Sequence, residues 1–135
     1  MNLSLHRPEN VNDTDLVLFQ NNSSDDYGCW SKVGRQGGIQ KIQLSDNQCY
    51  TKAKVAHEIY HSIGFYHEHT RIDRDQYVNV NHNCTRTGTG TKNNFKVQPK
   101  TETYGLPYDG LSIMHYKSTQ GSIDPESCKT ITSQV

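Results

Sequence analysis

The clearest periodic pattern in the chain lies between Lys52 and Ile63. Apolar residues recur there at positions 53, 55, 56, 59, 60 and 63, a spacing that places them along one side of an α-helix. Thr51 is suited to cap the start of this helix, and Gly64 stands where a left-handed residue would end it. The pattern therefore predicts a helix over 52–63.

Three segments before this helix have the pattern of β-strands. Leu16 to Phe19 is a short apolar run between polar residues, which predicts a buried strand. Asn2 to His6 alternates polar and apolar positions and is a candidate partner for it. Ile39 to Leu44 alternates less regularly, with an interruption near Lys41, and this favours a strand at the edge of a sheet.

Beyond Arg71 the periodic patterns stop. The stretch TRTGTGTKNN is typical of a loop, YGLPYDG has the composition of turns, and LSIMHY is a short apolar segment. About 65 residues with so little regular structure are uncommon unless a metal or disulfides organise them.

Composition limits the core that these elements can build. Apolar residues make up 32% of the 135 residues, which is low for a globular domain, so we expect a thin core. The net charge is zero, which argues against a nucleic-acid-binding or basic membrane-surface protein. No apolar stretch approaches the ~20 residues needed to span a bilayer.

Four cysteines favour an oxidising compartment. They are widely spaced and form no CxxC pair, which favours two disulfides, with three possible connectivities. Five N-x-S/T sequons support the same setting; they begin at Asn2, Asn12, Asn21, Asn22 and Asn83. Segment 1–10 lacks the apolar core of a signal peptide. The expectation of secretion therefore depends on the cysteines and the sequons, together with a family resemblance, and not on a leader sequence.

The predicted helix carries the sequence HEIYH. His57 and His61 are four residues apart and share one helix face, so both imidazoles can bind one ion. Glu58 lies beside that face, where it can accept a proton from a metal-bound water. Gly64 turns the chain, and His67 then completes a site of three nitrogens. Three protein ligands and one open position are the pattern of catalytic zinc, which lowers the pKa of bound water to about 7.

Other interpretations fit these residues less well. A zinc site whose third ligand is a downstream glutamate is disfavoured, because no glutamate lies between Glu68 and Glu102. A solvated helix face or a metal-buffering protein does not require the ordered spacing of the three histidines. A non-catalytic, zinc-stabilised peptide-binding fragment remains the alternative function, although such a site has no need of Glu58.

The motifs extend beyond the helix. H-E-x-x-H-x-x-G-x-x-H followed by a methionine turn is the metzincin signature, and SIMHY is the candidate turn, with Met114 beneath the metal. Within the metzincins, GFYHEHTRIDRDQYV, SIMHY and GCWSKVGRQGG resemble the astacin family of zinc endopeptidases. The resemblance is dense from about Asp15 to Tyr116.

The resemblance implies an α+β, zincin- or metzincin-like fold. A twisted mixed β-sheet is expected to pack on the active-site helix, followed by an irregular C-terminal subdomain with the Met-turn. The chain would be a single, partial catalytic domain over 1–135, with an upper subdomain over 1–64 and a lower one over 65–135. We expect a secreted monomer that binds an extended polypeptide along Ile39–Ser45, with neither nucleic acid nor membrane as a partner.

The resemblance also implies the role of each site residue. His57, His61 and His67 are expected to hold one Zn²⁺, and Glu58 to act as general base and then as general acid to the leaving amine. Tyr116 is expected to be a fifth zinc ligand that swings away on substrate binding and hydrogen-bonds the oxyanion. The substrate and the cleavage specificity do not follow from the sequence.

The cysteines and Glu68 complete the expectations. The resemblance implies a disulfide between Cys29 and Cys49. Cys84 and Cys128 match no cysteine of the family, and we hypothesise that they pair with each other. Glu68 usually meets the amino terminus of the mature enzyme in this family, a link that this shorter chain is not expected to form in the usual way.

Several polar residues are expected to be structural. His69 stands two residues after His67 and points to the opposite side of an extended chain, so we expect it beside the site or at the surface. His115 is expected to be structural, and His6 and His82 to be exposed. Internal salt links are expected among a group of charged residues, Arg71, Asp73, Arg74 and Asp75.

Overall fold

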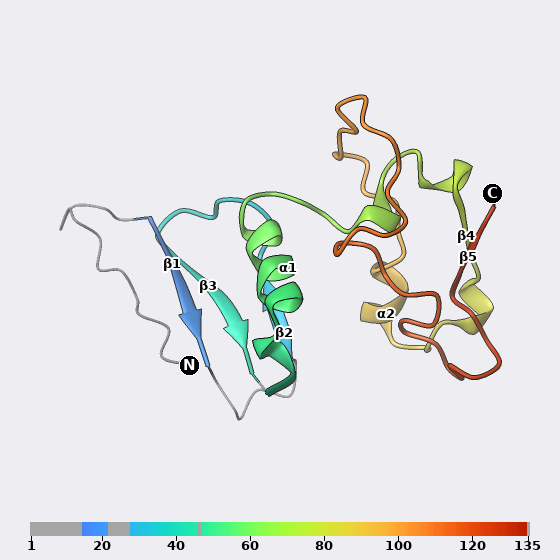
Figure 1. Cartoon of the computed structure of the whole chain (residues 1–135), viewed down its shortest axis with the longest axis horizontal. Coiled ribbons are helices and arrows are strands. Elements are labelled where there is room, and N and C mark those ends of the chain that lie inside the picture. The colour runs from blue at the N-terminus through green and yellow to red at the C-terminus, as the bar shows by residue number, and fades with distance from the viewer. Residues whose placement is uncertain (1–14, 22–27, 46, 135) are drawn as a thin grey trace. The chain divides into compact units, whose positions relative to one another are not determined.

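The computed structural model describes residues 15–21, 28–45 and 47–134, which divide into two units between Phe65 and Tyr66. Figure 1 labels β1, β2, β3 and α1 in the first unit, and β4, β5 and α2 in the second. The strand predicted over Asn2 to His6 lies outside the described residues. The upper and lower subdomains expected over 1–64 and 65–135 stay predictions.

A three-stranded mixed sheet forms one side of the first unit. Its strands are β1 (Leu16–Gln20), β3 (Ile39–Leu44) and β2 (Cys29–Ser31), in the order β1-β3-β2. β1 runs parallel to β3 with Leu16 opposite Ile39, and β2 runs antiparallel with Cys29 opposite Leu44. Figure 1 shows β1 and β3 side by side, with their arrows pointing the same way. The expected mixed sheet is confirmed.

The prediction that β3 is an edge strand is wrong. β1 pairs with one side of β3 from Ile39 to Gln43, and β2 pairs with the other side from Ile42 to Leu44. The last three residues of β3 are all buried, because a central strand buries side chains on both faces, and this explains the irregular alternation. The expected pairing of a substrate along Ile39–Ser45 is therefore misplaced. Among the described residues, β2 ends the sheet on that side.

β1 is less buried than its apolar sequence predicts. None of its residues is fully buried, and Val17 is 49% exposed. Within the described sheet β1 has β3 as its one neighbour. An apolar run therefore identified the strand correctly but not its position, because periodicity carries no information about neighbouring strands.

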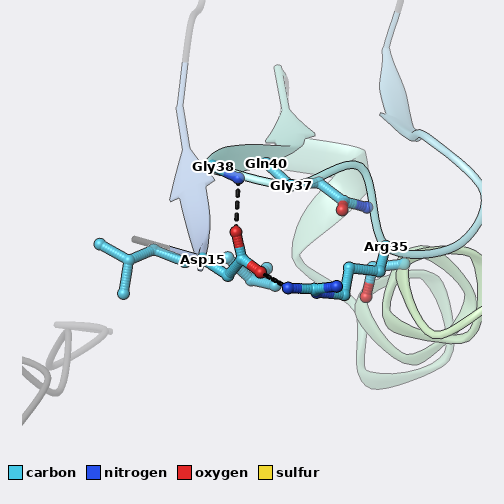
Figure 2. Close-up of a pocket in the computed structure, with 8 residues that line it drawn as sticks. Asp15, Arg35, Gly37, Gly38 and Gln40 are labelled. Atoms are coloured by element: carbon cyan, nitrogen blue, oxygen red, sulfur yellow. Dashed lines mark hydrogen bonds and ion pairs between the residues drawn. The ribbon is translucent and has the colours of Figure 1, made fainter. Parts of the chain in front are cut away.

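A carboxylate sets the register at the start of β1. Asp15 Oδ1 accepts a hydrogen bond from the Gly38 N–H at 2.6 Å, and the Leu16 N–H donates to the Gly38 carbonyl at 3.0 Å. Figure 2 shows the Asp15 carboxylate between Gly38 and the Arg35 guanidinium, with which it forms an ion pair. The Gly38 bond, and then Arg35, lower the pKa of Asp15. The pocket around them contains none of the predicted site residues.

α1 (Lys52–Ser62) confirms the predicted helix and packs against β2 and β3. It follows a 3₁₀ turn, η1 (Asn47–Tyr50). Thr51 Oγ1 accepts a hydrogen bond from the Lys54 N–H at 3.3 Å, which confirms Thr51 as the N-cap. Gly64 has a φ of 114°, a conformation that residues with a side chain rarely adopt. The helix therefore ends where the sequence predicted.

The core between α1 and the sheet is small. Ile42, Leu44 and Cys49 are buried, and Phe19, Cys29 and Val55 pack against them. Cys29 and Cys49 form a disulfide across 20 positions of sequence, as expected. The disulfide joins β2 to the segment just before α1, which adds a covalent link to a core of few apolar side chains.

The second unit consists of short elements. They are η2 (Glu68–Thr70), η3 (Arg74–Gln76), β4 (Val78–Val80), η4 (His82–Cys84), α2 (Thr89–Asn93) and β5 (Ile131–Ser133). β4 and β5 pair antiparallel, with Val78 opposite Ser133. The core is formed by Val78, Phe95 and Ile131, against which Tyr77, Val80, Tyr108 and Tyr116 pack.

The prediction of a continuous loop over TRTGTGTKNN is wrong at α2. Thr89 to Asn93 forms a single helical turn, which glycine and threonine disfavour intrinsically. Phe95 follows it at 0% exposure and contributes to the core of the unit. Burial of this ring holds the preceding turn against its propensity, a tertiary effect with no local signal.

The second disulfide confirms the hypothesis that Cys84 and Cys128 pair. It links η4 to the segment before β5 across 44 positions of sequence.

Among the residues that the structure describes, no helix is long and apolar enough to cross a membrane.

Candidate active site

Two histidines lie one turn apart on α1, as the sequence predicts. The ring centroids of His57 and His61 are 4.6 Å apart, with the rings edge to face. His61 is 7% exposed, and its burial lowers its pKa. At neutral pH His61 is therefore the neutral imidazole that a metal ion requires.

The carbonyl of Phe65 orients His61. His61 Nδ1 lies 2.8 Å from this oxygen, which can only accept, so Nδ1 carries the hydrogen and Nε2 carries the lone pair. The Gly64 N–H donates to the His61 carbonyl at 3.0 Å, and the Phe65 N–H donates to the Tyr60 carbonyl at 2.9 Å. The helix end predicted from Gly64 thus brings the Phe65 carbonyl to the histidine. The sequence analysis did not predict Phe65 as the partner of His61. The turn at Gly64 was the available signal, because it directs the next carbonyl back toward the end of the helix.

Glu58 occupies the buried side of α1. It is 4% exposed, and its Oε2 has no hydrogen-bond partner among the described residues. Burial raises the pKa of Glu58 to about 7, while a hydrogen bond from the Ser31 backbone lowers it by less. Ser31 belongs to β2, so the end of the sheet lies beside the carboxylate. The role of the Ser31 backbone had no signal in the sequence.

The third histidine begins the second unit. Among the described residues, His57, His61 and His67 form the one group of three or more His, Cys, Asp or Glu side chains suited to hold a metal ion. The chain itself limits how far His67 can lie from His61. Successive Cα atoms are about 3.8 Å apart, so the Cα of His67 stays within about 8 Å of that of Phe65, which contacts the His61 ring.

His67 is packed against the Met-turn inside the second unit. The ring centroid of Tyr116 is 4.7 Å from that of His67. The Glu68 N–H donates to the Met114 carbonyl at 2.9 Å, which ties the residue after His67 to the turn. Met114 is 5% exposed, and the His115 N–H donates to the Ser112 carbonyl at 2.9 Å. The segment SIMHY therefore forms the predicted turn.

Two histidines hold the backbone of Tyr116. The Tyr116 N–H donates to His69 Nδ1 at 3.4 Å, and the Tyr116 carbonyl accepts from His115 Nδ1 at 2.6 Å. The hydroxyl of Tyr108 lies 2.6 Å from His115 Nε2 and donates to it. His115 is thus structural, as expected, and it fixes the main chain that carries the Tyr116 ring.

His69 is more deeply buried than its spacing suggested. It is 0% exposed, its Nε2 donates to the Asn94 carbonyl at 3.0 Å, and its Nδ1 accepts from Tyr116. Its ring stacks on those of His67 and Tyr116, with centroids 5.3 and 4.1 Å away, so of the two expected positions the structure shows the one beside the site and not the one at the surface. Both ring nitrogens are used by the neutral form, and burial lowers the pKa of His69 to about 4.

We expect His69 to make the second unit sensitive to acid. A base whose pKa falls from 6.5 to about 4 on folding binds its proton more readily in the unfolded chain. The free energy of unfolding should therefore fall as the pH drops below about 6.5, by about 2 kcal/mol at pH 5. Urea unfolding between pH 7.5 and 5 should show this extra loss in the wild type and in His82→Gln, but not in His69→Gln. Equal slopes in all three would contradict it.

Arg71 joins the segment after His67 to the loop before the Met-turn. Its Nε and Nη2 donate to Asp73 at 3.0 and 2.9 Å, and its Nη1 donates to Glu68 Oε1 at 2.9 Å. Its remaining two N–H groups donate to the carbonyls of Leu106 at 3.0 Å and Pro107 at 3.1 Å. All five donors of the guanidinium are therefore used. The expected internal salt links are present.

Glu68 belongs to the same network. Its Oε1 also accepts from the Asp109 N–H at 2.9 Å. Its side chain is 17% exposed and that of Arg71 is 11% exposed. In the described structure Glu68 therefore braces the loop that leads to Met114. Arg74 adds a second link, donating to the carbonyls of His69 at 2.9 Å and Phe95 at 3.0 Å.

Arg71→Lys should lower the free energy of unfolding by about 3 kcal/mol. A lysine has three donors and no planar fork, so at least two of the five hydrogen bonds to Arg71 are lost, and each such charged bond contributes about 1.5–3 kcal/mol. Urea unfolding measures the change. Arg86→Lys is a suitable comparison, because Arg86 Nε makes one hydrogen bond, to the Ser122 carbonyl. Equal stability of Arg71→Lys and the wild type would contradict the assignment.

Comparison with known proteins identifies the family. The sequence profile of the peptidase family named Astacin matches residues 4–135. The chain belongs to the astacin family. Zinc metalloproteinase nas-14 of Caenorhabditis elegans is 40% identical over 111 residues, which are 81% of this chain and 21% of the relative. An astacin-like metalloendopeptidase of Gallus gallus is 40% identical over 89 residues, 66% of this chain and 21% of the relative.

A solved structure supports the same assignment. High choriolytic enzyme 1 of Oryzias latipes, a hatching enzyme zinc-protease, superimposes with a TM-score of 0.82 at 33% sequence identity. The match covers 93% of this chain and 58% of that one. The α+β astacin fold is therefore confirmed, with zinc as the family's metal. This astacin chain spans about a fifth of the length of the two curated relatives above.

Proposed function

We propose that this chain is a zinc-dependent endopeptidase in which His57, His61 and His67 bind one zinc ion and Glu58 is the general base. The observation that carries the proposal is the environment of Glu58. Its carboxylate is buried on the helix that carries His57 and His61, and one of its oxygens has no hydrogen-bond partner among the described residues. A buried carboxylate oxygen is costly without a partner, and a metal-site water is the partner that this position offers.

The donor set fits zinc. Three imidazoles with an open fourth position are a common arrangement of catalytic zinc, and His61 has its Nδ1 directed to a carbonyl, as metal-ligating histidines usually do. Bound zinc would act as a Lewis acid that lowers the pKa of a bound water to about 7 and polarises a carbonyl group. Membership of the astacin family supports zinc over other metals.

Glu58 moves the proton in the proposed reaction. Its carboxylate takes a proton from the attacking water and then gives it to the nitrogen of the departing amine. Burial raises the pKa of Glu58 to about 7 in the metal-free chain, and a bound cation would lower it, so the carboxylate would be ionised and able to accept the first proton at neutral pH. Tyr116 is proposed as a further residue that would hold the zinc ion, and its hydroxyl would donate a hydrogen bond to the oxyanion of the substrate. Hydrogen bonds from the Tyr116 N–H to His69 and from His115 to the Tyr116 carbonyl hold the main chain that carries this ring.

We propose an extended polypeptide as the substrate, bound along β2. β2 ends the described sheet on the side away from β1, and the backbone of its Ser31 contacts Glu58. A strand added to β2 would therefore bring a peptide bond close to the general base. The two disulfides support an extracellular setting, and one zinc per chain and a monomeric state remain part of the proposal.

The zinc ligands can be tested one at a time. His57→Ala, His61→Ala and His67→Ala should each lower zinc affinity by at least about 10-fold and abolish peptide cleavage. His82→Ala, an exposed histidine outside the site, should leave zinc content unchanged. Zinc is measured by elemental analysis after dialysis, and cleavage with a quenched peptide library. Full zinc content in His67→Ala would contradict the site, whereas zinc and peptide binding without cleavage in the wild type would favour the non-catalytic alternative.

A further inference from the structure

The chain contains an acceptor motif for a sugar that the proposed peptidase function does not use. Asn83-Cys84-Thr85 has the pattern N-x-S/T with no proline in the middle. It is the one such motif whose three residues all lie in the described part of the chain. The others begin at Asn2, Asn12, Asn21 and Asn22, and each includes residues outside the described ranges.

Asn83 is placed to carry a large substituent in the folded protein. It lies in η4 and its side chain is exposed. Its backbone N–H donates to Asn81 Oδ1 at 3.1 Å, but its carboxamide makes no hydrogen bond among the described residues. The neighbouring Asn81 is different: its carboxamide accepts that bond and also donates to Cys84 Sγ at 3.2 Å. A group attached to Asn83 Nδ2 therefore breaks no hydrogen bond among the described residues.

The hydroxyl that completes the motif is accessible only before folding. Thr85 is 2% exposed, and its Oγ1 donates to the His82 carbonyl at 2.8 Å. The middle residue, Cys84, is bonded to Cys128 across 44 positions of sequence. At about 5–20 residues per second, Cys128 is synthesised roughly 2–9 s after Cys84. During that interval the motif is neither folded nor closed by its disulfide.

We propose that Asn83 is N-glycosylated while the chain enters the secretory pathway, before the Cys84–Cys128 bond forms. The inference rests on the proposed extracellular setting. The donor is a lipid-linked diphospho-oligosaccharide. A bond forms between Asn83 Nδ2 and the anomeric carbon of the first sugar, the bond from that carbon to the phosphate oxygen breaks, and the lipid diphosphate leaves while Nδ2 loses one proton.

The test uses the full chain secreted from cultured insect cells behind a secretory leader. Glycosidase release in heavy-oxygen water converts a glycosylated asparagine to labelled aspartate, and peptide mass spectrometry locates it. Most of the peptide that contains position 83 should carry the label. Asn83→Gln and Thr85→Val should lose it, and Thr85→Ser should keep it. Secreted, disulfide-bonded chain with unlabelled Asn83 overturns the proposal.

The order of events has its own control. Cys128→Ser removes the disulfide partner but not the motif, so its occupancy at Asn83 should equal that of the wild type. A marked rise in occupancy in Cys128→Ser would show that the disulfide competes with transfer and would overturn the proposed order. Peptide cleavage by the same secreted chain is measured separately, so a chain that cleaves without a glycan refutes the glycan alone.

Discussion

Replacing Glu58 by glutamine is expected to lower kcat/KM for peptide cleavage by about 10²–10⁴-fold, the range that a positioned general base contributes. Glutamine fills the same buried space but accepts no proton, so chemistry should be lost while α1 keeps its fold. Glu58 is 4% exposed and lies against Ser31 of β2. The rate is measured with a quenched peptide and normalised to bound zinc.

The pH dependence gives this prediction a second readout. The base must be ionised, so kcat/KM should rise with pH through the pKa of Glu58. That pKa is about 7 without metal, and a nearby cation lowers it, so the acidic limb should lie below pH 7 and be absent from Glu58→Gln. Glu102→Gln, at an exposed position, should keep the wild-type rate and profile. A Glu58→Gln variant that binds zinc and cleaves at the wild-type rate would refute the role of Glu58.

Removing the Cys84–Cys128 disulfide is expected to lower the free energy of unfolding by about 4 kcal/mol. The bond closes a loop across 44 positions, and the chain entropy that the unfolded state gains when such a loop is opened gives this magnitude. The loop contains Phe95, Met114 and Tyr116, so its loosening should also disturb the Met-turn. Urea unfolding of the Cys84→Ser/Cys128→Ser double variant measures the loss.

The first disulfide provides the matched comparison. Cys29–Cys49 closes a loop across 20 positions in the other unit, for which the same relation gives about 3 kcal/mol. Limited proteolysis should then separate the two: cleavage sites should open beyond Tyr66 in the Cys84/Cys128 double variant and before it in the Cys29/Cys49 variant. Unchanged stability of the Cys84/Cys128 variant would contradict the proposed contribution of this bond.

The parts of the site that depend on local spacing could be predicted from the sequence. His57 and His61 are one turn apart because a helix repeats every 3.6 residues, and Gly64 ends the helix because its φ is positive. Thr51 caps the helix for an equally local reason. The spacing of the apolar residues identified the helix itself but not its buried side. The buried residues of α1 are Glu58, His61 and Ser62 and not the apolar ones. Ile59 and Ile63 are 38% and 64% exposed.

The remaining features depend on contacts between distant segments. β3 is central because β1 and β2 pair with it, and no pattern within its own six residues indicates those neighbours. The burial of His69 depends on Asn94 and Tyr116, which lie 25 and 47 positions away. α2 depends in the same way on the burial of Phe95. Local propensity is too weak to overrule such contacts.

The cysteine pairings lie between these two cases. Four cysteines allow three connectivities, so the pairing of Cys29 with Cys49 followed from the resemblance to the astacins and not from spacing. Cys84 and Cys128 then remained to pair with each other, and the structure confirms both bonds. The network of Arg71 was foreseen only as a group of charges, since its carbonyl partners Leu106 and Pro107 have no signal in the sequence.

One measurement tests the central claim most directly: the initial rate of peptide cleavage by the zinc-free, folded chain as zinc is added back in small steps. We predict no cleavage at the start, a linear rise with added zinc and a plateau at one zinc ion per chain. The Glu58→Gln variant should stay near zero throughout. A folded chain that binds zinc but cleaves nothing at any ratio, or that cleaves equally well without zinc, would contradict the assignment of this chain as a zinc endopeptidase.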